Sequence, residues 1–423
     1  MTVLFLLLAC EPKGDIPLDT DTSPVDNDGC GDTIYVPQSG VDTTDPVAAD
    51  LDAATFGGAP DPSAVHLSWV GDPSESMAFV WLTDNITLAS QVEFGLADTY
   101  GTVTPGASFE LLNGETFGRV HEVHVCGLTP ATTYHYRVGG EGHWSADHTF
   151  TTGPAPGSTT AYRFVVAGDS RNNAAVWGQI LEAAEQFAPD FYIFSGDAVE
   201  LGSDLEEWRA WLGEGLGYIE RRPMVMIHGN HEFMAQPFFG LFAMPANASA
   251  DRTDDEQWFS FDYGNGHFVV LNDTLAPLDT QATWMTGDLA ATSQPWKFVS
   301  HHQPAYSSST THGSNIDVRE AWSPVEEAAG VALDLVGHNH NYERSVPLRD
   351  GVETDLASGT TYVVSGGAGA DLYGNDLAEP FTATATVDNN WVLVEVNGGT
   401  LTLNAYDLSG NVIDTLTLSR SAP

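Results

Sequence analysis

Basic residues are scarce in this chain. Its 423 residues include 14 Lys and Arg against 58 Asp and Glu, which gives a formal net charge of −44. So acidic a protein repels the phosphate backbone of nucleic acids and anionic lipid surfaces, and we therefore expect no nucleic-acid partner. Cysteine is also rare: Cys10, Cys30 and Cys126 form no CxxC pair, so zinc-ribbon and thioredoxin-type sites are not expected.

The amino terminus carries an apolar run at residues 3–9 that is far too short to span a bilayer. The run leads into Leu7-Leu8-Ala9-Cys10, which resembles a bacterial lipobox. Residues 1–10 are therefore predicted to be a lipoprotein-type signal segment, with membrane attachment only through a lipid on Cys10, and secretion by another signal is the alternative. Residues 11–60 are expected to form an acidic flexible linker. A Cys30–Cys126 disulfide remains open.

Short strand-like segments dominate residues 61–154. Apolar and polar residues alternate in segments such as AVHLSWV, MAFVWLT and TTYHYRVGG. Gly, Pro and Asp separate these segments at a spacing of about ten residues, which is typical of a β-sandwich. We expect this all-β domain to precede a second domain of a different class.

The pattern changes near Arg163 and predicts an α/β domain over residues 160–420. Buried strand-like runs such as AYRFVVA and DFYIF end in short polar motifs. Helical periods follow them at about residues 174–187, 205–216, 280–292 and 317–329. In such a layout the functional groups lie at the carboxyl ends of the strands.

Five of these strand-end motifs carry side chains that bind metals. The residues are Asp169, Asp197, Asn230 with His231, His302, and His338 with His340. Two metal ions about 3.5–4 Å apart need a shared carboxylate and further Asp, Asn and His ligands, which this set supplies. Each motif alone is weak, since Gly-Asp is usually a turn, but five in succession predict a dinuclear metal site.

The order of these motifs resembles the calcineurin-like metallophosphoesterases, and among them the purple acid phosphatases. The resemblance covers residues 62–418 and includes Val299, His302, Pro304 and Tyr306, and the run GHNHNYER at 337–344. It implies a fibronectin-III-like sandwich followed by an α/β, layered domain with two central mixed sheets flanked by helices. It also implies two metal ions, for which Fe, Zn and Mn are the candidates.

Roles for individual residues follow from this resemblance. It implies that Asp169 and His340 bind the first metal and that Asp197 bridges the two ions. The second metal would be held by Asn230, His302 and His338. His231 would contact phosphate, and His312, ten residues after His302, stands where plant members place a histidine that donates a proton.

Two positions depart from the family pattern. Glu200 stands where purple members have the tyrosine whose phenolate gives the colour, and Arg171 stands where other members have a histidine ligand. Glu200 is expected either to reach the metal or to lie at the surface. Arg171 is expected either to contact phosphate or to pair with a nearby carboxylate. His301, next to the ligand position of His302, is expected behind the site or at the surface.

The resulting expectation is a secreted or lipid-anchored enzyme that hydrolyses small phosphate monoesters by attack of a metal-bound hydroxide. A phosphodiesterase or nucleotidase on the same site is one alternative. A surface binding protein with an inactive catalytic domain is the other.

Overall fold

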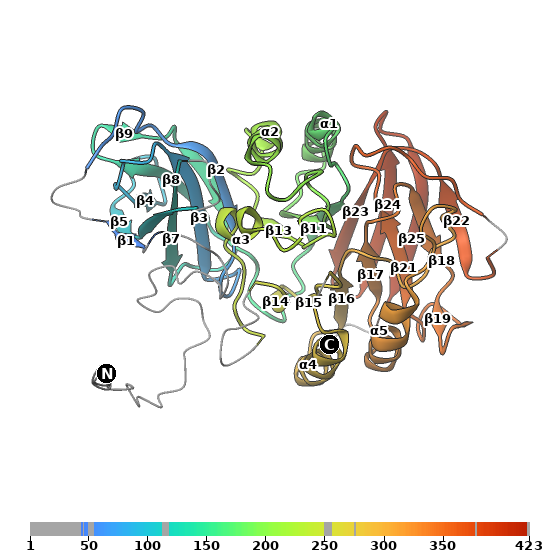
Figure 1. Cartoon of the computed structure of the whole chain (residues 1–423). Helices are drawn as coiled ribbons and strands as arrows, with labels where there is room; N and C mark the ends of the chain where they lie inside the picture. Colours follow the sequence, from blue (N-terminus) through green and yellow to red (C-terminus); the bar gives the residue numbers. More distant parts are fainter. Residues whose placement is uncertain are drawn as a thin grey trace, which may run out of the picture.

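The computed structural model describes residues 44, 46–49, 55–111, 118–248, 256–274, 276–376 and 379–420. Its first part is a sandwich of two antiparallel sheets, at the left of Figure 1. One sheet runs in the order β1 (Val47–Ala48), β6 (Ala107–Glu110), β7 (Arg119–Cys126), β3 (Ser76–Thr83) and β2 (Ser63–Ser68). The other runs β10 (His148–Thr151), β8 (Thr133–Gly140), β4 (Gln91–Gly95) and β5 (Thr102–Pro105), with β9 (His143–Trp144) beside β8.

The second part contains two mixed sheets. The six-stranded sheet has the order β13 (Met224–Met226), β12 (Phe191–Phe194), β11 (Tyr162–Ala167), β23 (Asn390–Asn397), β24 (Thr400–Asp407) and β25 (Val412–Ser419). The seven-stranded sheet has the order β14 (Phe259–Tyr263), β15 (Gly266–Val270), β16 (Trp296–Ser300), β17 (Leu333–Val336), β21 (Thr361–Ser365), β18 (Tyr342–Ser345) and β22 (Thr382–Thr386). A small hairpin pairs β19 (Leu348–Arg349) with β20 (Val352–Glu353).

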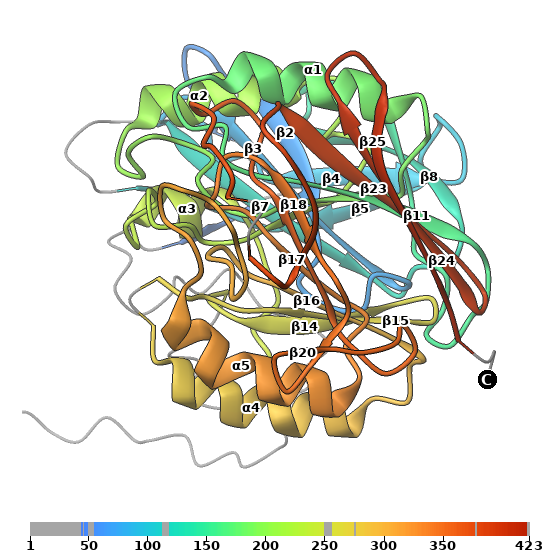
Figure 2. The same ribbon diagram turned by 90° about the vertical axis from the view of Figure 1, so that its right-hand side faces the viewer.

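Helices flank these sheets. They are α1 (Ala174–Glu185), α2 (Leu205–Gly215), the short α3 (Gln236–Leu241), α4 (Leu278–Ala291) and α5 (Ile316–Ala329). In Figure 2, α1 and α2 run along one side of the strands and α4 and α5 along the opposite side. The strands that bear the metal-site motifs therefore lie between the two helix pairs.

Local sequence explains why these elements form. Strands β11 and β12 are almost wholly apolar because they pair in parallel and are covered on both faces. Helix α5 begins where the Asn315 side chain accepts a hydrogen bond from the Val318 amide, and it ends at Gly330, whose φ of 71° is left-handed. Helices α1 and α2 pack through the stacked rings of Trp177 and Trp211, whose centroids are 5.6 Å apart.

The sandwich and the α/β part share one hydrophobic core. Trp69, just after β2, packs on Phe191 of β12 and on Tyr263 of β14. Polar contacts join the same surfaces, since the His66 imidazole lies 2.6 Å from the Leu241 carbonyl and the Tyr136 hydroxyl donates to the Glu220 carbonyl at 2.6 Å. The two parts are therefore joined by both apolar packing and hydrogen bonds.

The predicted fold class is confirmed. The sandwich, the two mixed sheets and the four long helices appear where the sequence pattern indicated them. The hairpin β14–β15 and helix α3 were not predicted. The hairpin did have a local signal, because residues 259–263 alternate apolar and polar side chains and the next three residues, Gly-Asn-Gly, favour a turn. Residues 236–241 are too few to show a helical period. Cys126 is disulfide-bonded, and the other two cysteines lie outside the described residues.

A buried histidine links the seven-stranded sheet to helix α4. His267 on β15 lies 2.6 Å from a carboxylate oxygen of Asp262 on β14 and 2.7 Å from one of Asp288 on α4. Burial alone would lower the pKa of His267, but these two carboxylates raise the pKa to about 9. The unfolded pKa is near 6.5, so the stabilisation is complete below that pH and is lost as the pH rises through 9.

We therefore expect the free energy of unfolding to fall by up to about 3 kcal/mol through this group between pH 6.5 and 9. His267→Gln should remove that part of the pH dependence, as measured by urea unfolding across the range. His135→Gln, which alters a histidine paired with Asp147 at the surface, serves as the control and should keep the wild-type profile. Identical profiles for wild type and His267→Gln would contradict the assignment.

Candidate metal centre

The candidate ligands come from loops at the carboxyl ends of strands in both sheets. Asp169 follows β11, Asp197 follows β12 and Asn230 follows β13, all in the six-stranded sheet. His302 follows β16, and the pair His338 and His340 follows β17, in the seven-stranded sheet. Hydrogen bonds join the two sets, because His302 Nδ1 lies 2.8 Å from the Ser195 carbonyl and the His338 amide donates to Asp169 Oδ2 at 2.8 Å.

Four of these side chains surround one point. His302 Nε2 lies 3.3 Å from Asp197 Oδ1, 3.1 Å from Asn230 Oδ1 and 3.3 Å from His338 Nδ1. Ligands of a tetrahedral ion with bonds of about 2.0–2.1 Å lie about 3.3–3.4 Å apart, so the spacing and the donor types fit a single metal ion. Asp197, His302 and His338 also form a compact group of ligand-type residues.

A second position lies between Asp169 and His340, whose Oδ1 and Nε2 atoms are 3.5 Å apart. Asp169 is fully buried, yet its Oδ1 accepts no hydrogen bond from the described residues. His340 Nδ1 lies 2.7 Å from the Asp371 carbonyl, which favours a proton on Nδ1 and a lone pair on Nε2. An orphaned carboxylate oxygen opposite an imidazole lone pair fits a second metal ion.

The protonation states of His338 and His340 favour metal binding. Burial lowers the pKa of His302, but the Asp197 carboxylate raises it well above the ordinary value, so a metal ion there would displace a proton. Burial raises the pKa of Asp169 well above its ordinary value, which means that the charged carboxylate lacks a compensating cation. Burial also lowers the pKa of His338 to about 3 and that of His340 to about 4. Both imidazoles are therefore neutral near pH 7, which is the form that binds metals.

The backbone at these loops is unusual. Asp169, Asp197 and His338 have φ values of 65°, 55° and 66°, in the left-handed region. Such conformations cost free energy outside glycine and occur most often at functional sites. Gly337 has a related role, because a Cβ there would lie 2.4 Å from Asp169 Oδ2, too close for the loop to keep its course.

The two residues that depart from the family pattern contact each other. Arg171 Nη2 lies 2.6 Å from Glu200 Oε1. Glu200 therefore has a partner other than a metal, and of the two roles expected for Arg171 the carboxylate pair is present. Arg171 Nε makes no hydrogen bond to the described residues, so the side chain still has a donor to offer.

The two remaining candidate histidines lie at the rim. His231 Nδ1 is 2.7 Å from the Glu200 carbonyl, and its Nε2 is 3.9 Å from Asp197 Oδ2. The His312 ring lies 4.6 Å from that of His338, so the loop after β16 returns to the site. All nine candidate residues thus gather in one region.

Sequence reasoning missed two residues of this region. The buried Glu232 carboxylate accepts hydrogen bonds from the amides of Asp197, Ala198 and Gly229, which fixes the loop that carries Asp197. Glu232 could have been singled out from the sequence, because it is a charged residue directly after the Asn230-His231 motif. Tyr373 gave no such signal: it lies far along the chain, yet its ring stacks on His340 at 4.0 Å and meets His312 at 5.3 Å.

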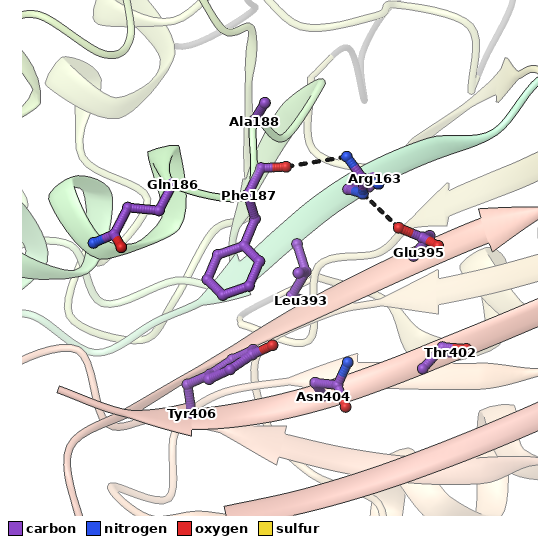
Figure 3. Close-up of a pocket in the computed structure, with 9 residues that line it drawn as sticks. All are labelled: Arg163, Gln186, Phe187, Ala188, Leu393, Glu395, Thr402, Asn404 and Tyr406. Carbon is purple, nitrogen blue, oxygen red and sulfur yellow. Dashed lines mark hydrogen bonds and ion pairs between the residues drawn. The ribbon is translucent and has the colours of Figure 1, made fainter. Parts of the chain in front are cut away.

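A separate cavity of about 450 Å³ contains none of these residues. It is lined by residues of β11, β23 and β24 and by the segment after α1, as Figure 3 shows. Arg163 crosses it and donates to the Phe187 carbonyl at 3.3 Å and to Glu395 at 2.5 Å. Its polar groups are largely paired, and it offers no metal ligands of the kind seen at the strand ends.

Known families match both parts of the chain. A model of the purple acid phosphatase N-terminal domain matches residues 62–152, and a model of calcineurin-like phosphoesterases matches residues 162–342. Purple acid phosphatase 21 of Arabidopsis thaliana is 29% identical over 311 residues, which cover 68% of this chain and 67% of the relative. An uncharacterized protein of Mycobacterium tuberculosis is 26% identical over 385 residues, covering 76% of this chain and 72% of that protein.

Solved structures agree in fold. A purple acid phosphatase from yellow lupin seeds superimposes with a TM-score of 0.76 at 20% identity, covering 85% of this chain and 75% of that one. The structure of PhoD superimposes with a TM-score of 0.64 at 13% identity, covering 87% and 94%. Members of this superfamily use a dinuclear metal centre. The chain therefore belongs to the calcineurin-like phosphoesterases and is a purple acid phosphatase-like, metal-dependent phosphoric ester hydrolase.

Proposed function

We propose that this protein hydrolyses phosphate monoesters at the site described above. The observation that carries the proposal is the convergence of six ligand-type side chains from two sheets on two adjacent positions. The proposed ligands are Asp169, Asp197, Asn230, His302, His338 and His340. Monoesters are favoured by the pairing of the two domains, and diesters or nucleotides on the same site remain the alternative.

When bound, two metal ions supply the positive charge that polarises a phosphoryl group and activates water. Asp197 is proposed to be the ligand that both ions share. Its carboxylate is held in place, because Oδ1 accepts the His231 amide at 2.8 Å while Glu232 fixes the Asp197 amide at 2.9 Å. These contacts fix the Asp197 side chain, so it would hold a metal ion without having to reorient.

Substrate contacts are proposed for His231 and Arg171. The contact of His231 Nδ1 with the Glu200 carbonyl leaves Nε2 available to a phosphoryl oxygen near Asp197. Arg171 has a buried Nε donor without a partner, and its pairing with Glu200 holds the guanidinium in one orientation. Both side chains would stabilise the negative charge that develops during transfer.

His312 is proposed to protonate the leaving group. It is exposed and lies over His338 at the mouth of the site, where a leaving alcohol would depart. Burial and the nearby Arg171 charge lower the pKa of His312. A lowered pKa makes the imidazolium a stronger acid, and because the ring is then protonated only at lower pH, such a donor suits an acid phosphatase.

We also propose that the protein is exported, with a lipid on Cys10 or free. Disulfide bonding of Cys126 suits an oxidising compartment. In the part of the chain that the structure describes, no helix is both long and apolar enough to span a bilayer.

The function is tested with purified protein on p-nitrophenyl phosphate, together with metal analysis. Asp197→Ala is expected to abolish hydrolysis and to lose both proposed catalytic ions, because this residue is the shared ligand. Glu214→Ala, an exposed change on α2, serves as the control. Near wild-type activity of Asp197→Ala with its metals retained would rule out the assignment.

The colour of the iron-loaded protein is a second test. Because Glu200 replaces the ligand tyrosine and is paired with Arg171, we expect no intense visible band from a tyrosinate. Glu200→Tyr should introduce such a band. A strong band in the wild type would contradict the expectation, and its loss in Tyr373→Phe would identify Tyr373 as the ligand.

The role of His312 is tested with two substrate classes. If it protonates the leaving group, His312→Ala should slow hydrolysis of alkyl phosphates by about 10²–10⁴-fold. Hydrolysis of p-nitrophenyl phosphate should slow much less, because that leaving group needs little protonation. Equal losses on both substrates, with a raised KM, would show that His312 grips phosphate instead.

The lipid-anchored form of the export proposal predicts a lipid on Cys10. In a bacterial host that processes lipoproteins, wild type should collect in the membrane fraction and Cys10→Ser in the soluble fraction, as fractionation and the mass of the amino-terminal peptide would show. Equal partitioning of the two forms would exclude lipidation.

A further inference from the structure

A second group of ligand-type side chains lies behind the metal centre. It consists of His301 at the end of β16, Asp334 on β17 and Glu326 on α5, and one ligand atom of each lies within 4.8 Å of the others. All three residues are buried, with exposed fractions of 0–1%. The expected position of His301 at the surface is therefore excluded. Figure 1 shows α5 packed beside β16 and β17.

The spacing in this buried group resembles that in the candidate metal centre. His301 Nε2 lies 3.2 Å from Asp334 Oδ1 and 3.3 Å from Asp334 Oδ2. The ligand atoms around His302 are separated by 3.1–3.3 Å. Two ligand atoms that bind one small ion tetrahedrally, with bonds of about 2.0–2.1 Å, lie at this distance from each other.

Two oxygen atoms of the group lack hydrogen-bond partners. Glu326 Oε2 and Asp334 Oδ1 accept none from the described residues, although both atoms are buried. Burying an unpaired carboxylate oxygen is costly unless a cation or a proton satisfies it. No ion pair between Lys or Arg and either residue is found in the described parts of the chain.

The imidazole is oriented as a metal ligand would be. His301 Nδ1 lies 3.0 Å from Asp273 Oδ2, which favours a proton on Nδ1. Nε2 then faces Asp334 Oδ2 at 3.3 Å, where either a second proton or a metal ion balances the carboxylate charge. A carboxylate behind a histidine is the usual support of a ligating imidazole. The edge of the Trp322 indole packs against the ring at 4.9 Å, which keeps the site dry.

We propose that His301, Glu326 and Asp334 bind a third divalent cation, separate from the two at the candidate centre. One imidazole and two carboxylates form a donor set that suits Zn²⁺ or Mn²⁺. The ion would tie β16, β17 and α5 together. It would also fix Asp273, whose carboxylate accepts the amides of His302 at 3.0 Å and Gln303 at 2.6 Å, and so steady the strand end that presents His302.

The experiment counts metals after the full-length protein is loaded with Zn²⁺ and dialysed. Wild type is expected to hold three equivalents and Glu326→Gln two. Glu327→Gln is the matched control, since Glu327 lies on the same helix but accepts hydrogen bonds from Tyr362 and Asp350, and it should hold three. Asp197→Ala is expected to keep one equivalent, which the added Glu326→Gln change removes.

Thermal unfolding gives a second readout. Zn²⁺ added to metal-free Asp197→Ala should raise its Tm by several degrees, because an ion that binds only the folded state stabilises it, and should not raise that of Asp197→Ala/Glu326→Gln. Should the Glu326 variants fail to fold, Asp197→Ala/His302→Ala takes their place, because it removes two proposed ligands of the second catalytic ion. It should still bind one equivalent of Zn²⁺, and loss of that ion would overturn the third site.

Two outcomes distinguish failure of the third-site proposal from failure of the proposed catalytic function. Equal metal content in wild type and Glu326→Gln, with an unchanged Tm, would overturn the third site and leave Glu326 holding a proton. Retention of all ions by Asp197→Ala, together with loss of one by Glu326→Gln, would overturn the proposed catalytic pair while supporting the third site.

Discussion

The packing of the two mixed sheets depends on how buried negative charge is satisfied where their strand ends meet. Asp169 and Asp197 come from one sheet, and the imidazoles that face them come from the other. Neither carboxylate has a Lys or Arg partner among the ion pairs of the described residues. Carboxylates removed from water in this way need a cation, so metal binding and the docking of the two sheets are energetically linked.

The Arg171–Glu200 pair shows how the chain differs from its relatives without breaking the site. Two positions that elsewhere provide metal ligands here hold opposite charges in direct contact. A lone arginine beside the first metal position would repel the ion, and a lone glutamate would add negative charge. Because the two side chains are in contact, their charges largely cancel. The substitutions at Arg171 and Glu200 are therefore one coupled change.

Behind the candidate metal ligands, buried carboxylates hold the backbone of the loops that carry them. Glu232 fixes the loop of Asp197 through three backbone amides, and Asp273 holds the amide of His302 and the ring of His301. Each carboxylate orients a ligand loop without needing to touch a metal. Precise placement of the ligands therefore depends on buried carboxylates that have little tolerance for substitution.

The sequence alone was enough for the fold class and for the identity of the strand-end residues. Alternating and continuous apolar runs report local burial, and the motifs at Asp169, Asp197 and His302 each follow such a run directly. The hairpin β14–β15 was missed although its first strand alternates apolar and polar residues. Strand β23 pairs with β11, more than 200 residues earlier in the chain, and no local pattern encodes that pairing.

Only the tertiary structure decided which distant residues became neighbours. Tyr373 on His340, Glu326 beside Asp334, and Arg171 against Glu200 are contacts between segments that no spacing rule connects. The same holds for His301, whose side of the strand end could be inferred from alternation, but whose burial depended on α5 covering it. A sequence pattern reports which face a side chain takes, whereas its partners are set by how the sheets and helices pack.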